Sequence, residues 1–291
     1  MKSSTEIGSF ARYIGYERAV EAVAKTGFDA FDLSLISLAD YNYDTKVGVL
    51  NELNPFNKPS YLALAKKLKQ IGLDNGIICN QSHAPFPVAD KVIKTLIKKC
   101  IEITAEAGGE YCIIHPNNFL SASENAEMFF DLISFGKEHG VKIATENMWG
   151  WNKEIERAFP MACGTPEDFN AHLDAVNDDY LVACLDVGHA EMLGDKVNAA
   201  DFVRALNKRL HCLHIHDNDR WKDLHLIPFA SKIDFAPIVK ALKEINYKGY
   251  FTLECDAYMI ARGKNGESEI YNGLKDLHVA VNKLIEMFEN Q

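Results

Sequence analysis

Short apolar runs alternate with longer segments of helical periodicity along most of the chain. The apolar runs are about four to eight residues long and rich in β-branched and aromatic side chains, a pattern typical of buried strands. Strands that are apolar on both faces and alternate with helices form parallel sheets. Eight such rounds follow one another, which predicts an α/β fold, the closed (β/α)8 or TIM barrel.

The predicted strands lie within residues 5–10, 28–35, 73–85, 111–116, 141–147, 181–189, 210–217 and 250–256. The predicted helices lie near residues 16–25, 61–72, 89–107, after 123, from 165 onward, 198–208, 235–245 and 269–290. We expect Gly72 to cap the second of these helices, and the sequence SASE before the fourth to supply its N-cap. Residues 148–164 are predicted to form a long irregular loop.

Length and composition set the class of protein. A chain of 291 residues suits one barrel, and no linker or repeat divides it, so residues 1–291 are predicted to form a single domain. No segment has the roughly 18 consecutive apolar residues of a membrane span, and the N-terminus lacks the apolar region of a secretory signal. Seven scattered cysteines without a CxxC motif argue for a reducing compartment, so we expect a cytoplasmic protein. A formal charge of −10 argues against a nucleic-acid partner.

Six of the predicted strands end, on their C-terminal side, in a residue that can bind metal. These residues are His83, His115, Glu146, Asp186 with His189, His216, and Glu254, and Asp223 and His225 follow the His216 strand. The C-terminal ends of barrel strands meet at one rim, where active sites are built. We therefore expect these side chains to lie together.

Three carboxylates at one rim require a compensating charge. Glu146, Asp186 and Glu254 would repel by about 4 kcal/mol per pair at 4 Å and an effective dielectric near 20, unless a cation intervened or one held a proton. With His216 they form an oxygen-rich set that suits Mn²⁺, Co²⁺ or Mg²⁺, while the full set of histidines favours zinc. The alternative is structural: each carboxylate caps a helix or pairs with an arginine, and each histidine bonds a backbone carbonyl.

Two tryptophans follow one of these glutamates closely. Trp149 and Trp151 stand three and five residues after Glu146, and aromatic side chains commonly line ligand pockets, although displaced core residues are the alternative. Arg220, in the loop after the seventh strand, is a candidate for holding an anionic group, with ordinary surface charge as its alternative.

The ordered segments SHAP, IIHP, TEN, LDVGH, HIHDND, DLH and LEC resemble the xylose isomerase-like TIM-barrel superfamily. This superfamily includes sugar and sugar-phosphate isomerases and epimerases and the endonuclease IV family. The resemblance extends from the second predicted strand to the eighth. Barrels of this superfamily often assemble as homo-oligomers.

The resemblance implies two alternative ligand sets. In the ketose epimerases one Mn²⁺ or Co²⁺ is held at positions that match Glu146, Asp186, His216 and Glu254, and the two glutamates act as acid and base. In the nucleases three zinc ions are held at positions that match all nine rim residues named above. Nucleases of this kind bind DNA through loops rich in basic residues. The corresponding long loop of this chain, residues 149–160, has only Lys153 and Arg157 as cations, which argues against DNA binding.

The first hypothesis is therefore a metal-dependent isomerase or epimerase of a small sugar or sugar phosphate, with Glu146 and Glu254 catalytic. Its substrate is expected to contact Trp149, Trp151, His189 and Arg220. The second hypothesis is a trinuclear-zinc hydrolase of phosphate esters, similar to endonuclease IV. A third, a non-enzymatic barrel with a decayed site, is disfavoured by the complete ligand set.

Overall fold

Eight parallel strands form one sheet in the computed structural model, which describes residues 1–194 and 197–291. The strands are β1 (Lys2–Glu6), β2 (Ala30–Ser34), β5 (Ile78–His83), β6 (Tyr111–Ile113), β7 (Lys142–Glu146), β10 (Leu181–Asp186), β11 (Leu210–His214) and β12 (Tyr250–Leu253). Their order in the sheet is β11-β10-β7-β6-β5-β2-β1-β12. The amide of Ile215 donates to the carbonyl of Thr252 at 2.9 Å, which joins the two outer strands and closes the predicted barrel.

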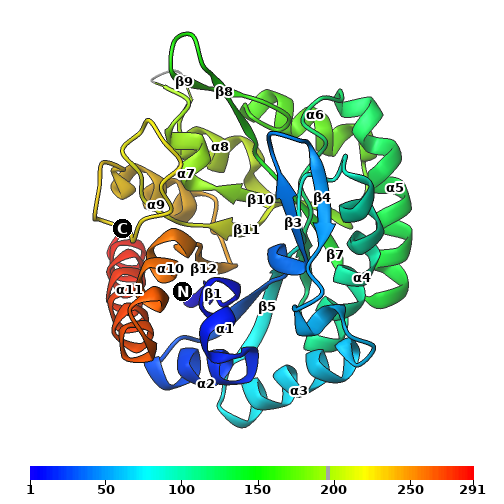
Figure 1. Ribbon diagram of the computed structural model, residues 1–291. Helices are drawn as coiled ribbons and strands as arrows, with labels where there is room; N and C mark the ends of the chain where they lie inside the picture. Colours follow the sequence, from blue (N-terminus) through cyan, green and yellow to red (C-terminus); the bar gives the residue numbers. More distant parts are fainter. Residues whose placement is uncertain (195–196) are drawn as a thin grey trace.

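Helices surround the sheet as an outer ring (Figure 1). They are α1 (Gly8–Ile14), α2 (Tyr16–Thr26), α3 (Tyr61–Asp74), α4 (Lys91–Ala107), α5 (Ala122–His139), α6 (Pro166–Val176), α7 (Val187–Glu191), α8 (Ala199–Leu206), α9 (Phe235–Glu244), α10 (Asp256–Lys264) and α11 (Glu267–Glu289). Their apolar faces pack on the outside of the sheet and bury the main core. Among the described residues, no helix has both the length and the apolar character needed to cross a membrane.

A small separate cluster of apolar side chains fills part of the barrel interior. Ile113, Ala144, Val182, Cys184 and Cys212 are all buried there, one or two from each of four adjacent strands. All seven cysteines are buried free thiols, so they pack as small apolar residues.

The first strand was placed too late in the sequence. β1 ends at Glu6, and residues from Gly8 onward form α1 instead. Its residues are polar yet buried, because their side chains find partners on other strands: the Ser4 hydroxyl donates to Asn80 Oδ1 on β5 at 2.7 Å. An apolar pattern could not reveal such a strand.

Two predicted helix ends were also wrong. Gly72 lies inside the last turn of α3, where a Cβ would come within 2.9 Å of the Ile77 carbonyl oxygen, so close packing, not capping, requires glycine. α5 begins at Ala122, before the predicted start after Ser123, but the SASE sequence does supply the N-cap as predicted, since Ser121 caps the helix and forms a capping box with Glu124.

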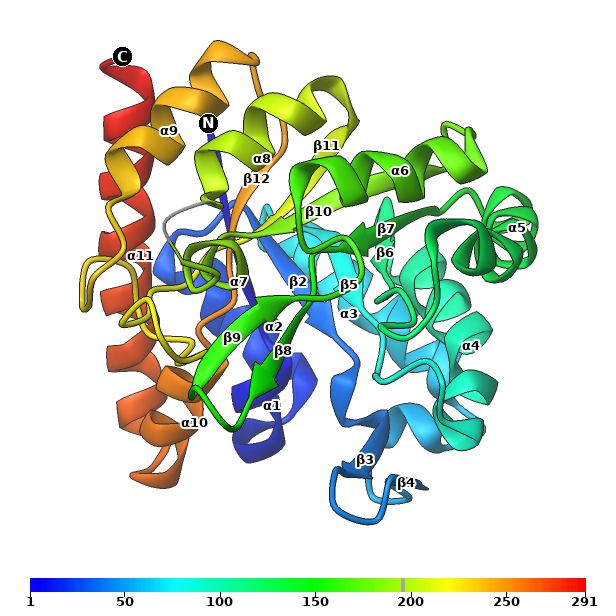
Figure 2. The same ribbon diagram turned by 90° about the horizontal axis from the view of Figure 1, so that it is seen from above.

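Residues 148–164 are not an irregular loop. They contain a β-hairpin of β8 (Trp149–Asn152) and β9 (Arg157–Pro160), in which Trp151 pairs with Ala158. A second hairpin, β3 (Ala39–Asn42) and β4 (Val47–Leu50), follows β2. Figure 2 shows both hairpins at the same end of the barrel, where the strands finish. The α6 start was predicted correctly, with Thr165 as N-cap.

Candidate metal centre

All nine predicted ligands lie at the C-terminal rim and form one continuous cluster. Their potential ligand atoms fall into overlapping groups in which every atom is within 4.8 Å of the others. One group contains His83, His115 and Glu146, a second contains Glu146, Asp186 and His189, and a third contains His189, His216, Asp223 and His225. Glu254 joins a group with His83 and His214. The strand ends therefore bring together residues up to 171 positions apart, from 83 to 254.

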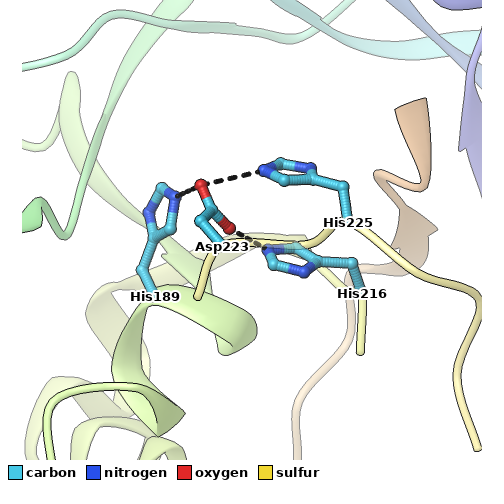
Figure 3. Close-up of side chains that lie close together, drawn as sticks. All are labelled: His189, His216, Asp223 and His225. Carbon is cyan, nitrogen blue, oxygen red and sulfur yellow. Dashed lines mark ion pairs between the residues drawn. The ribbon is translucent and has the colours of Figure 1, made fainter. Parts of the chain in front are cut away.

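The third group is held by a short loop after β11. Asp217 and Leu226 exchange two backbone hydrogen bonds, of 2.8 and 3.0 Å, and so close the loop that carries Asp223 and His225. Asp223 then lies between three imidazoles (Figure 3), with oxygen to Nε2 distances of 3.3 Å to His189, 3.5 Å to His216 and 3.2 Å to His225.

Asn147 and the short helix α7 fix the second group. The Asp186 amide donates to Asn147 Oδ1 at 2.8 Å, and Asn147 Nδ2 donates to the Asp186 carbonyl at 2.9 Å, which ties the ends of β7 and β10 together. Asp186 is also the N-cap of α7, and its Oδ1 accepts from the His189 amide at 2.6 Å. This cap turns the chain so that His189 faces Glu146 and Asp223 instead of continuing the predicted strand.

Three histidines have their tautomer set by a backbone carbonyl. The Nδ1 atoms of His83, His189 and His225 lie 2.7, 3.0 and 2.9 Å from the carbonyl oxygens of Ala84, Asn147 and Glu254. A carbonyl only accepts, so each Nδ1 carries a proton. In a neutral ring this leaves the Nε2 lone pair facing the cluster, as metal-ligating histidines require.

Several buried polar atoms of the cluster lack a hydrogen-bond partner. They are Asp186 Oδ2, His216 Nδ1 and Asp223 Oδ1. A buried polar atom without a partner costs about 1–3 kcal/mol, so this arrangement fits a cation that would be coordinated by the surrounding atoms. The mixed set of carboxylates and imidazoles suits Mn²⁺, Co²⁺ or Zn²⁺.

The surroundings shift the pKa values of Glu254 and Glu146 in opposite directions. Burial raises the pKa of Glu254, whereas in Glu146 the effect of burial is outweighed by His214, His115 and His189, which hold its pKa well below the usual range. Burial lowers the pKa of His115 to about 4, so this imidazole is neutral at pH 7. The lowered pKa of Glu146 favours its ionised form at the centre of the cluster.

Neighbouring carboxylates raise the pKa values of His189 and His225. Burial disfavours a charged ring, but Asp186 and Asp223 raise the pKa of His189 well above its usual value, and Asp223 does the same for His225. The cluster thus favours bound positive charge, supplied by protons or by a cation. Metal binding would release those protons.

The sequence did not reveal the residues beneath the rim. His214 is fully buried, and its Nδ1 lies 3.1 Å from Glu146 Oε2 and 3.3 Å from Glu254 Oε2, while its Nε2 lies 3.3 Å from Asp32. Gln81 in turn donates to Asp32 at 2.9 Å. His214 stands two residues before His216 on one strand, so the period-2 pattern was the available signal.

The predicted substrate contacts are placed around this cluster. Trp149 and Trp151 are half-buried and line one pocket, and the Trp149 ring lies 6.2 Å from that of His189. Arg220 Nε lies 3.7 Å from a carboxylate oxygen of Glu191 and borders a neighbouring pocket. Among the predicted substrate contacts, Arg220 belongs neither to the groups of potential metal ligands nor to the pocket lined by the tryptophans.

The fold is a (β/α)8 barrel, and the C-terminal ends of its strands carry a cluster of residues that could hold a metal ion. A model of the xylose isomerase-like TIM barrel family matches residues 20–275. The chain therefore belongs to this family, as its motifs predicted.

Individual relatives have low sequence identity to this chain. A D-psicose 3-epimerase of Enterocloster bolteae is 24% identical over 250 residues, or 83% of this chain and 77% of that protein. An uncharacterized protein of Methanocaldococcus jannaschii is 27% identical over 193 residues, or 59% of this chain. The chain spans 62% of that protein and 54% of a similar Sinorhizobium fredii protein.

Solved structures confirm the architecture. A D-tagatose 3-epimerase-like protein superimposes with a TM-score of 0.71 at 19% identity, covering 100% of this chain and 99% of that one. The IOLI protein, solved with a zinc atom bound, superimposes with a TM-score of 0.70 at 17% identity and the same coverage. At these identities the likeness establishes the fold.

Proposed function

We propose that the protein is a divalent-metal-dependent isomerase or epimerase acting on a ketose. The observation that carries this proposal is the convergence of Glu146 and Glu254 on one buried nitrogen, His214 Nδ1, at the floor of the barrel mouth. Two carboxylates held close together at the barrel mouth can serve as a proton acceptor and a proton donor. The similarity to sugar 3-epimerases supports the same reaction class.

The residues that would hold the cation in this reaction are Glu146, Asp186, His216 and Glu254. When bound, the cation polarises the substrate carbonyl and the neighbouring hydroxyl. One glutamate takes the proton from the carbon beside the carbonyl, and the bonding electrons move onto the carbonyl oxygen, giving an ene-diolate. The other glutamate then delivers a proton to the opposite face, which inverts that carbon.

Solvent exchange tests this proposal. Metal-loaded protein is incubated in D2O with a panel of ketoses and their phosphates, and deuterium incorporation is followed by NMR. We expect exchange at one carbon of at least one sugar, and a loss of at least about 100-fold in Glu146→Gln and Glu254→Gln. Glu110→Gln, an exposed carboxylate beside Tyr111 at the start of β6, is the matched control and should retain activity. No exchange with any sugar, although metal is bound, would overturn the proposal.

A second candidate has its own supporting observation. All nine predicted zinc ligands lie in overlapping groups, and Glu146 belongs to three of them, which is the arrangement expected of a residue that bridges ions. This supports a trinuclear-zinc hydrolase of phosphate esters, in which Glu146 could not act as a free base. The acidic chain argues that any such ester is small and not DNA.

Metal counting separates the two candidates. Elemental analysis of the native protein should give one ion per chain for the epimerase and about three zinc ions for the hydrolase. His83→Gln and His115→Gln sharpen the comparison, because only the trinuclear arrangement uses these two side chains. Under the epimerase proposal both variants retain their full metal content.

A further inference from the structure

All three tryptophans of the chain line the same pocket. Trp149 and Trp151 come from β8, and Trp221 comes from the loop after β11. The pocket has a volume of about 610 Å³, and its remaining lining residues are Glu156, Lys222 and Asp223. Three half-buried indoles in one place form an aromatic surface that is open to a ligand.

This pocket adjoins the metal centre. Asp223 belongs to both, since it lines the pocket and also contacts His189, His216 and His225. The Trp149 ring faces His189 with 6.2 Å between ring centroids. A molecule held at the rim therefore has the tryptophan pocket directly beside it.

The walls of the tryptophan pocket come from two separate chain segments that contact each other. Trp149 and Trp151 are two residues apart on β8, so they project to the same side of the hairpin. Arg157, on the paired strand β9, places its guanidinium 3.9 Å from the centroid of Trp221. The Trp221 amide also donates to Asp219 Oδ1 at 2.9 Å. The stacked cation therefore fastens the hairpin to the loop after β11.

The lining defines the chemistry of the ligand. Indole faces pack well against flat, apolar surfaces, while the carboxylates of Glu156 and Asp223 and the ammonium of Lys222 can bond hydroxyl groups. Two acidic groups against one basic group disfavour a phosphate. A sugar ring has an apolar C–H face and a hydroxyl-bearing edge, and so suits both parts of the pocket.

The volume of the tryptophan pocket indicates how large its ligand is. A reacting ketose occupies the metal centre itself, and the adjoining pocket alone falls within the range of about 300–1,000 Å³ of small-molecule sites. We infer that the substrate carries a second sugar ring, which stacks among the three tryptophans while the ketose unit lies over the metal centre. This inference rests on the proposed function and makes it more specific, because it selects a glycosylated ketose over a sugar phosphate.

Tryptophan fluorescence tests this directly, because every indole of the chain belongs to the pocket. Metal-loaded protein is titrated with D-fructose and with three disaccharides that contain a reducing ketose, turanose, lactulose and isomaltulose, which differ in linkage. We expect at least one disaccharide to change the emission and to bind about tenfold more tightly than fructose.

Two variants locate the effect. Trp221→Ala should lower the affinity for that disaccharide about tenfold more than the affinity for fructose, with the metal content unchanged by elemental analysis. Ile155→Ala, an exposed apolar residue between β8 and β9 that does not line the pocket, should leave the ratio of the two affinities unchanged.

The outcomes separate this inference from the proposed function. Deuterium exchange into a monosaccharide, with no disaccharide bound more tightly than fructose, would overturn the second-ring inference alone. A disaccharide that binds through Trp221, while no sugar of the whole panel exchanges deuterium, would support the pocket assignment and overturn the proposed reaction. Tighter binding of phenyl glycosides than of every disaccharide would overturn the assignment of a sugar to this pocket.

Discussion

The Nδ1 atom of His214 lies 3.1 Å from Oε2 of Glu146, and both side chains are buried beneath the rim. His214 is not among the predicted ligands, yet it contacts both glutamates proposed to exchange the proton. Its other nitrogen is 3.3 Å from Asp32, so the ring is held from both ends. This makes His214 a positioning residue for the carboxylates above it.

Replacing His214 should weaken metal binding without unfolding the barrel. In His214→Gln the buried carboxylates lose their shared cationic partner, and partners of this kind typically contribute about 10–100-fold to metal affinity. Titration calorimetry with Mn²⁺ or Co²⁺ measures the change, and circular dichroism checks the fold. His211→Gln, on the same strand but next to Tyr111, is the control. Equal affinities in the two variants would refute the positioning role.

Gly188 leaves room for the imidazole of the proposed metal ligand His216. A Cβ built at this position overlaps the imidazole of His216, so Gly188→Ala should displace that ligand and lower metal affinity by about tenfold or more. Ala190→Gly, in the same helix α7, is the control, because it costs about 0.5–1 kcal/mol of helix stability without approaching His216. If both variants bind metal equally well, the close approach of Gly188 to His216 is unimportant.

Removing the metal should destabilise the protein. A ligand present at 100 times its dissociation constant stabilises the native state by about 2.7 kcal/mol, so a chelator should lower the melting temperature by roughly 5 °C. Scanning calorimetry with and without EDTA measures this difference. In Asp186→Asn, which keeps an N-cap for α7 but loses a ligand charge, the chelator should have a much smaller effect.

The stability of the metal-free protein should fall as pH rises from about 4.5 to about 8, owing to Glu6. Burial, together with the nearby carboxylates of Asp256 and Glu254, raises the pKa of Glu6 from 4.5 to about 8. Between these values the unfolded chain has released this proton and the native state still holds it. The contribution of Glu6 to the free energy of unfolding therefore decreases by about 1.4 kcal/mol per pH unit.

Glu6→Gln mimics the protonated carboxyl group and should remove that part of the pH dependence. Urea unfolding in EDTA at pH 5, 7 and 9 should show the variant gaining stability relative to the natural protein as pH increases. Glu110→Gln, an exposed carboxylate, should follow the natural protein at every pH. Parallel curves for Glu6→Gln and the natural protein would show that Glu6 titrates normally.

The predicted strands from 28–35 onward were found because they are apolar on both faces, the direct consequence of burial between a barrel interior and a ring of helices. β1 escaped this reasoning, since Ser4 and Thr5 are buried through hydrogen bonds to other strands. The β8–β9 hairpin was missed for a related reason. It is stabilised by pairing between its own strands and by the Arg157–Trp221 contact, and neither leaves an apolar period in the sequence.

By itself, the sequence determined which residues stand at the strand ends, because strand periodicity and barrel topology together assign Glu146, Asp186, His216 and Glu254 to one rim. Only the tertiary structure decided what lies beneath and beside that rim. It brought His214 and Asp32 into contact although 182 positions separate them, and it placed Trp221 against the pocket that Trp149 and Trp151 line. Such contacts depend on how neighbouring strands are staggered and how loops fold back, and these are properties of packing, not of any local stretch of chain.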